Sequence, residues 1–302
     1  IYTTTATEGN VLVYYYRGKV DNNIIFGDYC WKIIRTTETG GIKLIYNGTP
    51  TDGKCDNMSY SSISGLSAWN TTYDDAAYVG YMFGINNAGN STSKEEAQTN
   101  TYDSTIKTYL EDWFKNNILA YENYLENIIY CNDRRTVEGG TNNTLKSNYG
   151  TLGYGKNATG YAAIERVSSD TLIPKPEMTC ANANDSFSFV DSKNGNKKLK
   201  YSIGLITLDE AMLAGFNTYA SSNDDFKDTT NYLYNGLNFW TMTPIYVRAN
   251  DDARVGIVDG SGNVGNHRVS FEDGVRPVIS LKSGILIEPT GDGTTTNPYV
   301  VK

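Results

Sequence analysis

The chain has 302 residues, and 34 Asp and Glu residues outnumber 26 Lys and Arg residues, which gives a net charge of −8. This charge repels a phosphate backbone on average, so the composition speaks against a nucleic-acid partner. Charged residues make up only 20% of the chain, whereas Tyr occurs 24 times. That balance is typical of a β-rich surface protein and unlike a helical cytosolic enzyme.

The four cysteines lack the Cys-x-x-Cys spacing of a structural zinc site, and His267 is the single histidine. We expect two disulfides instead, Cys30–Cys55 and Cys131–Cys180, because each pair closes a separate loop and pins an irregular segment. The two other connectivities, and four buried free thiols, remain alternatives. Disulfides would predict an oxidising compartment, and hence an extracellular location at a cell or virion surface.

No run of about 18 apolar residues occurs, so we expect no membrane-spanning segment. The chain also starts without an initiator Met or a signal peptide, in what reads as a strand. We therefore interpret it as a mature or excised fragment.

The N-terminal part predicts strands at 11–16, 23–34 and 42–46, because β-branched and aromatic residues alternate there with turn signals such as Gly27-Asp28. From 47 to about 101 the sequence is polar and rich in Gly and Ser. No helical period persists in this stretch, which predicts loops and short strands.

Apolar residues recur at helical spacing after Tyr102, which predicts a helix over 103–117 with Asp103 or Ser104 as its N-cap. A second helical stretch is expected at 121–130. Residues 132–192 form another loop-rich insertion with two prolines.

A strand over 199–205 is expected to lead into a short helix. That helix begins at a capping box formed by Thr207 and Glu210 and ends at Gly215. Further strands are predicted at 239–242, 253–258 and 275–281, with turns at 259–263 and 272–274. Residues 285–302 read as a linker and a closing strand, with Val300-Val301 as an edge partner of 11–16 and the two termini close together.

The C-terminal third carries a recognisable set of motifs: Tyr232-Leu233-Tyr234, Phe239-Trp240-Thr241-Met242-Thr243-Pro244, Ala253-Arg254-Val255-Gly256, Gly262-Asn263 and Gly274-Val275-Arg276-Pro277-Val278-Ile279-Ser280-Leu281. With 29–35 and 201–210, this set resembles bacterial surface domains of the formylglycine-generating-enzyme-like branch of the C-type-lectin fold. The resemblance implies an α+β fold with a twisted antiparallel sheet and two to three helices. A single domain would then span 1–284, with insertions near 47–101 and 132–192.

In this group Trp240, Gly274 and Arg276 would be scaffold residues. Trp240 would fill the core between sheet and helix, Gly274 would permit a turn, and Arg276 would tie strand to loop by several hydrogen bonds. Several relatives are variable proteins of diversity-generating retroelements, in which the residues between the Trp strand and the Gly-x-Arg strand face a ligand. The corresponding positions are Tyr246, Arg248, Asn250, Asp251, Asp252, Arg254, Asn263, Asn266, His267, Arg268 and Ser270.

These residue types favour adaptable recognition. The sequence therefore predicts an extracellular, adhesin-like module that binds a surface protein or a glycan through 246–273. Membership of the diversified variable proteins stays open, because a single sequence shows no variation. The alternative is a structural subunit of a bacterial surface filament or pilus, in which this surface is a subunit interface. Further domains or filament subunits would be partners in either case.

Catalysis is not expected. An enzyme of the formylglycine-generating type needs a reactive cysteine pair near its C-terminus, but the last cysteine is Cys180. His267 lacks an accompanying nucleophile motif such as Gly-x-Ser-x-Gly. A pocket that joined His267 to a buried carboxylate of perturbed pKa would revive the enzyme reading.

No cofactor is predicted, although Asp251 and Asp252 with Asp259 leave calcium open. The Glu-Pro-Asn and Gln-Pro-Asp signatures of calcium-dependent sugar-binding lectins are absent, so a solvated loop is the simpler interpretation. Loop tyrosines also offer partner contacts. They are Tyr73, Tyr154, Tyr161 and Tyr246.

Overall fold

A computed structural model describes residues 1–56, 63–86, 89–137, 149–167, 176–192, 194–218 and 229–302. Within these residues, strands dominate and assemble into two seven-stranded sheets, with short helices packed around them. The predicted α+β class is confirmed.

The first sheet is centred on β4 (Tyr29–Thr36). In spatial order its path runs through β1 (Tyr2–Thr4), β2 (Val13–Tyr15), β4, β3 (Asn23–Phe26) and β20 (Tyr299–Val300), while β5 (Ile42–Tyr46) pairs with β4 and β19 (Val278–Leu281) pairs with β5. The predicted single strand over 23–34 is in fact the β3–β4 hairpin. Gly27 and Asp28 both have positive φ, +57° and +66°, which a two-residue hairpin turn requires.

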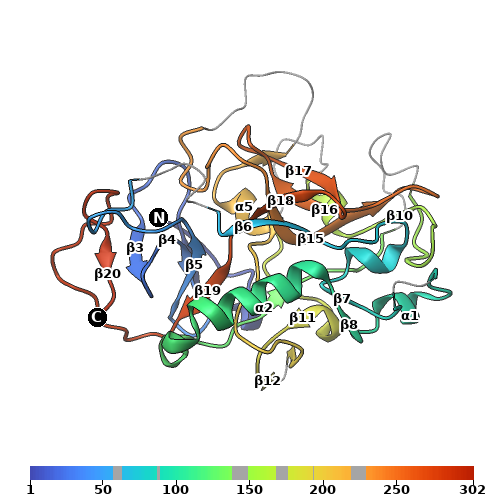
Figure 1. The fold of residues 1–302 in the computed structure, drawn as a ribbon, viewed down its shortest axis with the longest axis horizontal. Helices are drawn as coiled ribbons and strands as arrows, with labels where there is room; N and C mark the ends of the chain where they lie inside the picture. Colours follow the sequence, from blue (N-terminus) through green and yellow to red (C-terminus); the bar gives the residue numbers. More distant parts are fainter. Residues whose placement is uncertain (57–62, 87–88, 138–148, 168–175, 193, 219–228) are drawn as a thin grey trace.

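The closing strand does not pair as predicted. β20 runs parallel to β3, with Tyr299 opposite Ile24, whereas residues 13–15 pair with β1 and β4. β1 and β20 therefore lie at opposite ends of the path through this sheet. Both chain ends nevertheless lie at the end of the molecule that this sheet occupies (Figure 1).

The second sheet holds the C-terminal ribbon. Its path runs through β14 (Asn217–Thr218), β17 (Asn263–Arg268), β16 (Ala253–Val258), β15 (Phe239–Val247), β18 (Glu272–Val275) and β6 (Gly65–Ala68), and β10 (Thr159–Gly160) pairs with β15. β15 extends five residues beyond the predicted strand, since all nine of its residues are buried and no alternation marks its end. Sequence analysis missed β17, which is mostly half-buried and polar, and wrongly placed a turn where β18 lies.

The longest helix, α2 (Thr105–Asn117), is the one predicted from helical spacing, and Ser104 caps it by accepting a hydrogen bond from the Lys107 N–H. It runs along one side of both sheets (Figure 1). Trp113 of this helix packs against Trp31 of β4, with ring centroids 6.3 Å apart. The shorter helices are α1 (Lys94–Gln98), α4 (Ala163–Val167) and α5 (Leu208–Leu213), with 3-10 turns η1 (Glu8–Asn10), η3 (Ala76–Val79), η4 (Leu119–Tyr124) and η5 (Ala183–Asp185).

Three small two-stranded sheets of the described residues, built in part from the two insertions, lie around this framework. They are β7 (Met82–Phe83) with β8 (Tyr102–Asp103), β9 (Tyr130–Cys131) with β11 (Ser186–Phe187), and β12 (Asp191–Ser192) with β13 (Gly195–Asn196). Hydrophobic side chains from both sheets and from α2 form one continuous buried cluster.

Two predicted elements are absent for the same physical reason. The predicted helix at 121–130 shortens to η4, because Leu125 bridges to Leu281 and the Glu126 N–H donates to the Ser280 carbonyl. Residues 199–205 form no strand and make only a single bridge, from Gly204 to Val278. Backbone hydrogen bonds to β19 thus determine the conformation of both segments and override their local helix or strand propensity.

The capping box that starts α5 is confirmed in both directions. Thr207 accepts from the Glu210 N–H, and the Glu210 carboxylate accepts from the Thr207 N–H. The chain leaves this helix at Gly215, whose φ of +111° suits glycine. No helix among the described residues is both long and apolar enough to cross a bilayer.

Candidate functional site

The predicted ligand residues come together at one end of the second sheet. Register pairs Tyr246 of β15 with Arg254 of β16, and Arg254 with Arg268 of β17. These three side chains therefore form a row across three neighbouring strands. We call the surface around this row the arginine face; it consists of Tyr73, Tyr246, Arg248, Asp251, Asp252, Arg254, Arg268 and Phe271.

The turn that joins β15 to β16 places a carboxylate beside the row. The Arg248 N–H donates to the Asp252 carbonyl, and Asn250 adopts a φ of +56° while its N–H donates to the Lys156 carbonyl. This geometry directs Asp252 inward, where its side chain is fully buried. Asn250 itself is an exposed turn residue.

Asp252 holds the arginines in position. Its Oδ2 accepts from Arg254 Nε at 3.0 Å and from Arg268 Nε at 3.1 Å. Its Oδ1 makes no hydrogen bond within the described residues, and Arg248 Nε lies 3.9 Å away. Asp251 accepts from Arg268 Nη2 at 3.2 Å. Three guanidinium groups thus surround two carboxylates.

Aromatic rings flank the arginines. The Arg268 guanidinium carbon lies 4.8 Å from the Tyr73 ring centroid and 5.9 Å from that of Phe271, and these rings are 38% and 48% exposed. Tyr246 is buried and stacks on Tyr149, with ring centroids 4.9 Å apart. Tyr246 therefore supports the surface more than it offers contacts.

Sequence analysis did not name Phe271 or Tyr149. Phe271 directly follows Ser270, a predicted ligand residue that is half-buried. The signal that could have revealed Phe271 was its position in the sequence, between His267 and the acidic residues Glu272 and Asp273. Tyr149 lies in the insertion and had no local signal. Among the loop tyrosines proposed as contacts, Tyr161 is fully buried and hydrogen-bonds to the Ala76 carbonyl, which corrects that expectation.

His267 pairs with a buried carboxylate. Its Nδ1 lies 2.7 Å from Asp273 Oδ2, and its ring meets Phe271 edge-on at 5.4 Å. His267 and Asp273 do not line the cleft described below.

Of two further predicted positions, Asn263 lies away from the face and Asn266 borders it. Asn263 begins β17 and pairs with Asn217, at the opposite end of the strand from Arg268. Asn266 is closer, and its Oδ1 accepts from Arg254 Nη1 at 3.3 Å. Asp259 follows β16 whereas Asp252 precedes it, so the two carboxylates stand about 20 Å apart at the ends of a six-residue strand. They cannot share a calcium ion.

Two of the residues expected to be scaffold, Trp240 and Arg276, are buried and hydrogen-bonded to distant parts of the chain. Trp240 is fully buried and donates from Nε1 to the Ser67 carbonyl. Arg276 is fully buried and donates to the Tyr46 and Leu233 carbonyls and to Asn47 Oδ1. Burial lowers its pKa to about 9.

Gly274 is not a turn residue, which corrects the expectation for it. It lies in β18, where a Cβ atom would approach Ile63 Cδ1 to 2.3 Å and the Asn238 carbonyl oxygen to 2.7 Å. Glycine is required here because the neighbouring chain passes so close.

A charged cleft of about 270 Å³ lies where the first sheet, β15 and the start of α5 meet. At its base Glu210 accepts from both Arg35 and Lys43, at 2.9 and 2.7 Å. Burial alone would raise the pKa of Glu210, but Lys43 and Arg35 outweigh burial and lower it to about 2. Arg166 is paired with Asp209, whose pKa is raised by burial.

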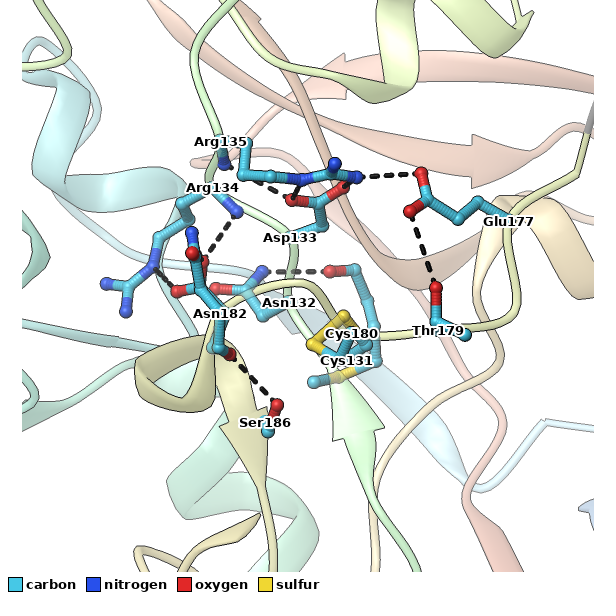
Figure 2. Close-up of a disulfide and its surroundings, with 12 residues drawn as sticks. Cys131, Asn132, Asp133, Arg134, Arg135, Glu177, Thr179, Cys180, Asn182 and Ser186 are labelled. Atoms are coloured by element: carbon cyan, nitrogen blue, oxygen red, sulfur yellow. Dashed lines mark hydrogen bonds and ion pairs between the residues drawn. A yellow bond between two sulfur atoms is a disulfide. The ribbon is translucent and has the colours of Figure 1, made fainter. Parts of the chain in front are cut away.

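The second wall of the cleft belongs to the 132–192 insertion. Figure 2 shows Asp133 and Glu177 on the Arg135 guanidinium, beside the disulfide formed by Cys131 and Cys180. Asp133 and Glu177 also bind Arg166. Every basic side chain that lines the cleft therefore already holds a carboxylate.

Both predicted disulfides are present. Cys30 joins Cys55, and Cys131 joins Cys180. Each pins an irregular segment: residues 47–55 against β4 in the first case, and the end of the long insertion against β9 in the second.

Comparisons of the chain with protein-family models, curated proteins and solved structures found no match.

Proposed function

We propose that this chain is an extracellular, non-catalytic recognition module of the C-type-lectin type, akin to the variable proteins of diversity-generating retroelements. It binds a protein or a glycan at a surface through the arginine face. The observation that carries the proposal is the placement of Arg254 directly opposite Arg268 on neighbouring strands. Like charges in this register destabilise a sheet, so such a pair needs a reason other than stability.

The composition of the face supports recognition. Arg, Tyr and other aromatic residues dominate binding hot spots, and rigid strands present such side chains more precisely than loops do. Arg268 and Arg254 project from paired strands and are held by the buried Asp252. Arg248, 47% exposed, extends this rigid pair towards solvent.

The location rests on the two disulfides, which persist in oxidising compartments. The proposed fold rests on the sequence motifs, with which the α+β architecture is compatible.

The test is a binding screen on arrays of glycans and surface proteins with two matched triple variants. The face variant changes Tyr73, Arg248 and Phe271 to Ala. The control variant changes Tyr2, Tyr14 and Arg17 to Ala, which likewise removes two aromatic residues and one arginine from exposed positions on or beside the first sheet.

We expect the face variant to lose binding while its melting temperature stays near that of the parent, and the control variant to bind normally. Equal binding by both variants would place recognition elsewhere and overturn the proposal.

A second candidate function, a filament subunit, is favoured by the exposed apolar edge of the first sheet. Ile1, Tyr2, Leu12 and Tyr14 are all exposed on or beside β1 and β2, and β1 is the last strand on its side of the sheet. Open apolar edges promote strand addition between chains. Analytical ultracentrifugation checks this: concentration-dependent polymers that the Tyr2/Tyr14/Arg17 variant abolishes would support the filament, and a monodisperse monomer would reject it.

A further inference from the structure

We infer that the ligand of the arginine face is an anionic saccharide, bearing carboxylate or sulfate groups. This inference rests on the proposed function and goes further by naming the chemistry of the ligand. The inference follows from three features of the face: its surplus positive charge, its unused N–H donors and its exposed aromatic rings.

The face has a surplus of positive charge. Arg248, Arg254 and Arg268 share two carboxylates, Asp251 and Asp252, which leaves one positive charge in a chain whose net charge is −8. The neighbouring lysine, Lys156, is already balanced by Asp74.

The surplus lies at particular atoms. All three nitrogens of the Arg254 guanidinium are engaged, by Asp252 and Asn266. Arg268 Nη1 makes no hydrogen bond within the described residues. The Arg248 guanidinium makes a long hydrogen bond, 3.4 Å, to the Tyr246 hydroxyl and also interacts with Tyr149, which leaves further N–H donors unused. The free donors therefore belong to Arg248 and Arg268, both solvent-accessible, and such forks bind anionic oxygens in pairs.

The rings indicate that the anion belongs to a sugar. The ring centroids of Tyr73 and Phe271 lie 4.8 and 5.9 Å from the Arg268 guanidinium carbon, and the two residues are 38% and 48% exposed. An inorganic anion gains nothing from such rings, whereas the C–H face of a pyranose packs on them. A polynucleotide also fits poorly, because the chain's net charge of −8 opposes its many phosphates.

The experiment is a glycan array that carries carboxylated, sulfated and neutral saccharides, probed with the parent protein and with the Arg248→Gln, Arg268→Gln and Arg17→Gln variants. Arg17 is an exposed arginine of the first-sheet side and serves as the matched control. The best saccharide is then titrated calorimetrically against its own neutral form, the methyl ester of a carboxylated sugar or the desulfated form of a sulfated one.

We expect hits confined to anionic saccharides, with the two classes on the array showing whether carboxylate or sulfate is preferred. Neutralising the saccharide, or changing Arg248 or Arg268 to Gln, should weaken binding roughly tenfold or more, as for loss of a charge-assisted hydrogen bond. Arg17→Gln should bind like the parent.

Two results would overturn the inference. A neutral saccharide that binds as tightly as its charged form would do so, and so would an array without any anionic hit. In either case the proposed function still stands if a neutral glycan or a surface protein binds the parent protein but not the Tyr73/Arg248/Phe271 variant. Anionic binding that none of the face variants weakens would instead remove both proposals.

Discussion

The charged cleft and the arginine face both bring arginine and carboxylate side chains together, and the two clusters differ in how their charges are paired. In the cleft, Glu210 holds Arg35 and Lys43, and Arg166 is surrounded by three carboxylates. In the face, three arginines share two carboxylates. In the cleft each lining cation already has a carboxylate partner, whereas in the face two arginines retain donors for a ligand. The cleft and the face therefore differ in whether their cations are fully paired, and not in whether charges are present.

The largest effect should come from Glu210→Gln in the cleft. The change leaves Arg35 and Lys43 buried without a compensating charge, which should lower the free energy of unfolding by about 3–5 kcal/mol. Urea denaturation measures it. Glu38→Gln, at the partly exposed end of the same network, is the control and should cost under about 1 kcal/mol. Similar losses in both variants would mean that the buried pairing is not what matters.

Acid should act on the same carboxylate. The pKa of Glu210 is about 2 in the folded chain and about 4.3 when unfolded, so the unfolded state binds a proton first as pH falls. The stabilisation is therefore complete above about pH 4.3 and is lost as pH drops towards 2. Melting curves between pH 6 and 2 measure this loss. The Glu210→Gln variant should show a shallower decline; an identical decline would assign acid sensitivity to other groups.

Asp252→Asn should have an intermediate effect. It removes the charge that separates Arg254 from Arg268, and we expect a loss of about 1–3 kcal/mol. Adding Arg268→Gln to this variant should restore part of the stability, because the repulsion then disappears. A double variant whose losses simply add would contradict the view that Asp252 acts by separating the two arginines.

The smallest effect on stability should come from Arg248→Gln. This side chain is about half exposed and its ion pairs are 3.9 Å long, so the free energy of unfolding should change by no more than about 0.5 kcal/mol. Binding through the face should weaken nonetheless. A large loss of stability would show that Arg248 is a structural residue. The face would then resemble the cleft, whose charged side chains stabilise the fold.

Local signals in the sequence predicted the elements that local physics decides. The helix with Ser104 at its cap, the Thr207–Glu210 capping box and the strand over 42–46 each carry their own pattern. Segments governed by distant partners were wrong or missed. Leu125 pairs with Leu281, and Gly204 with Val278, so no local period could reveal their conformation.

The candidate site shows the same division. The motifs brought Arg254, Arg268 and Asp252 into one predicted surface, but only strand register shows that the two arginines stand opposite each other. Tyr149 comes from an insertion, and its stacking on Tyr246 depends on how that insertion folds back. Asn263 was assigned to the face from the resemblance alone. It begins β17, at the opposite end of that strand from Arg268.

The placement of the last strand has a practical meaning. β20 joins β3 in the first sheet, whereas the β15–β16 hairpin that carries the arginine face extends to the other end of the molecule (Figure 1). A tether, tag or fusion partner attached at either terminus therefore leaves the arginine face pointing away from the support. The chain can be immobilised in a defined orientation on a sensor chip or a particle, with the ligand arriving from solution unobstructed.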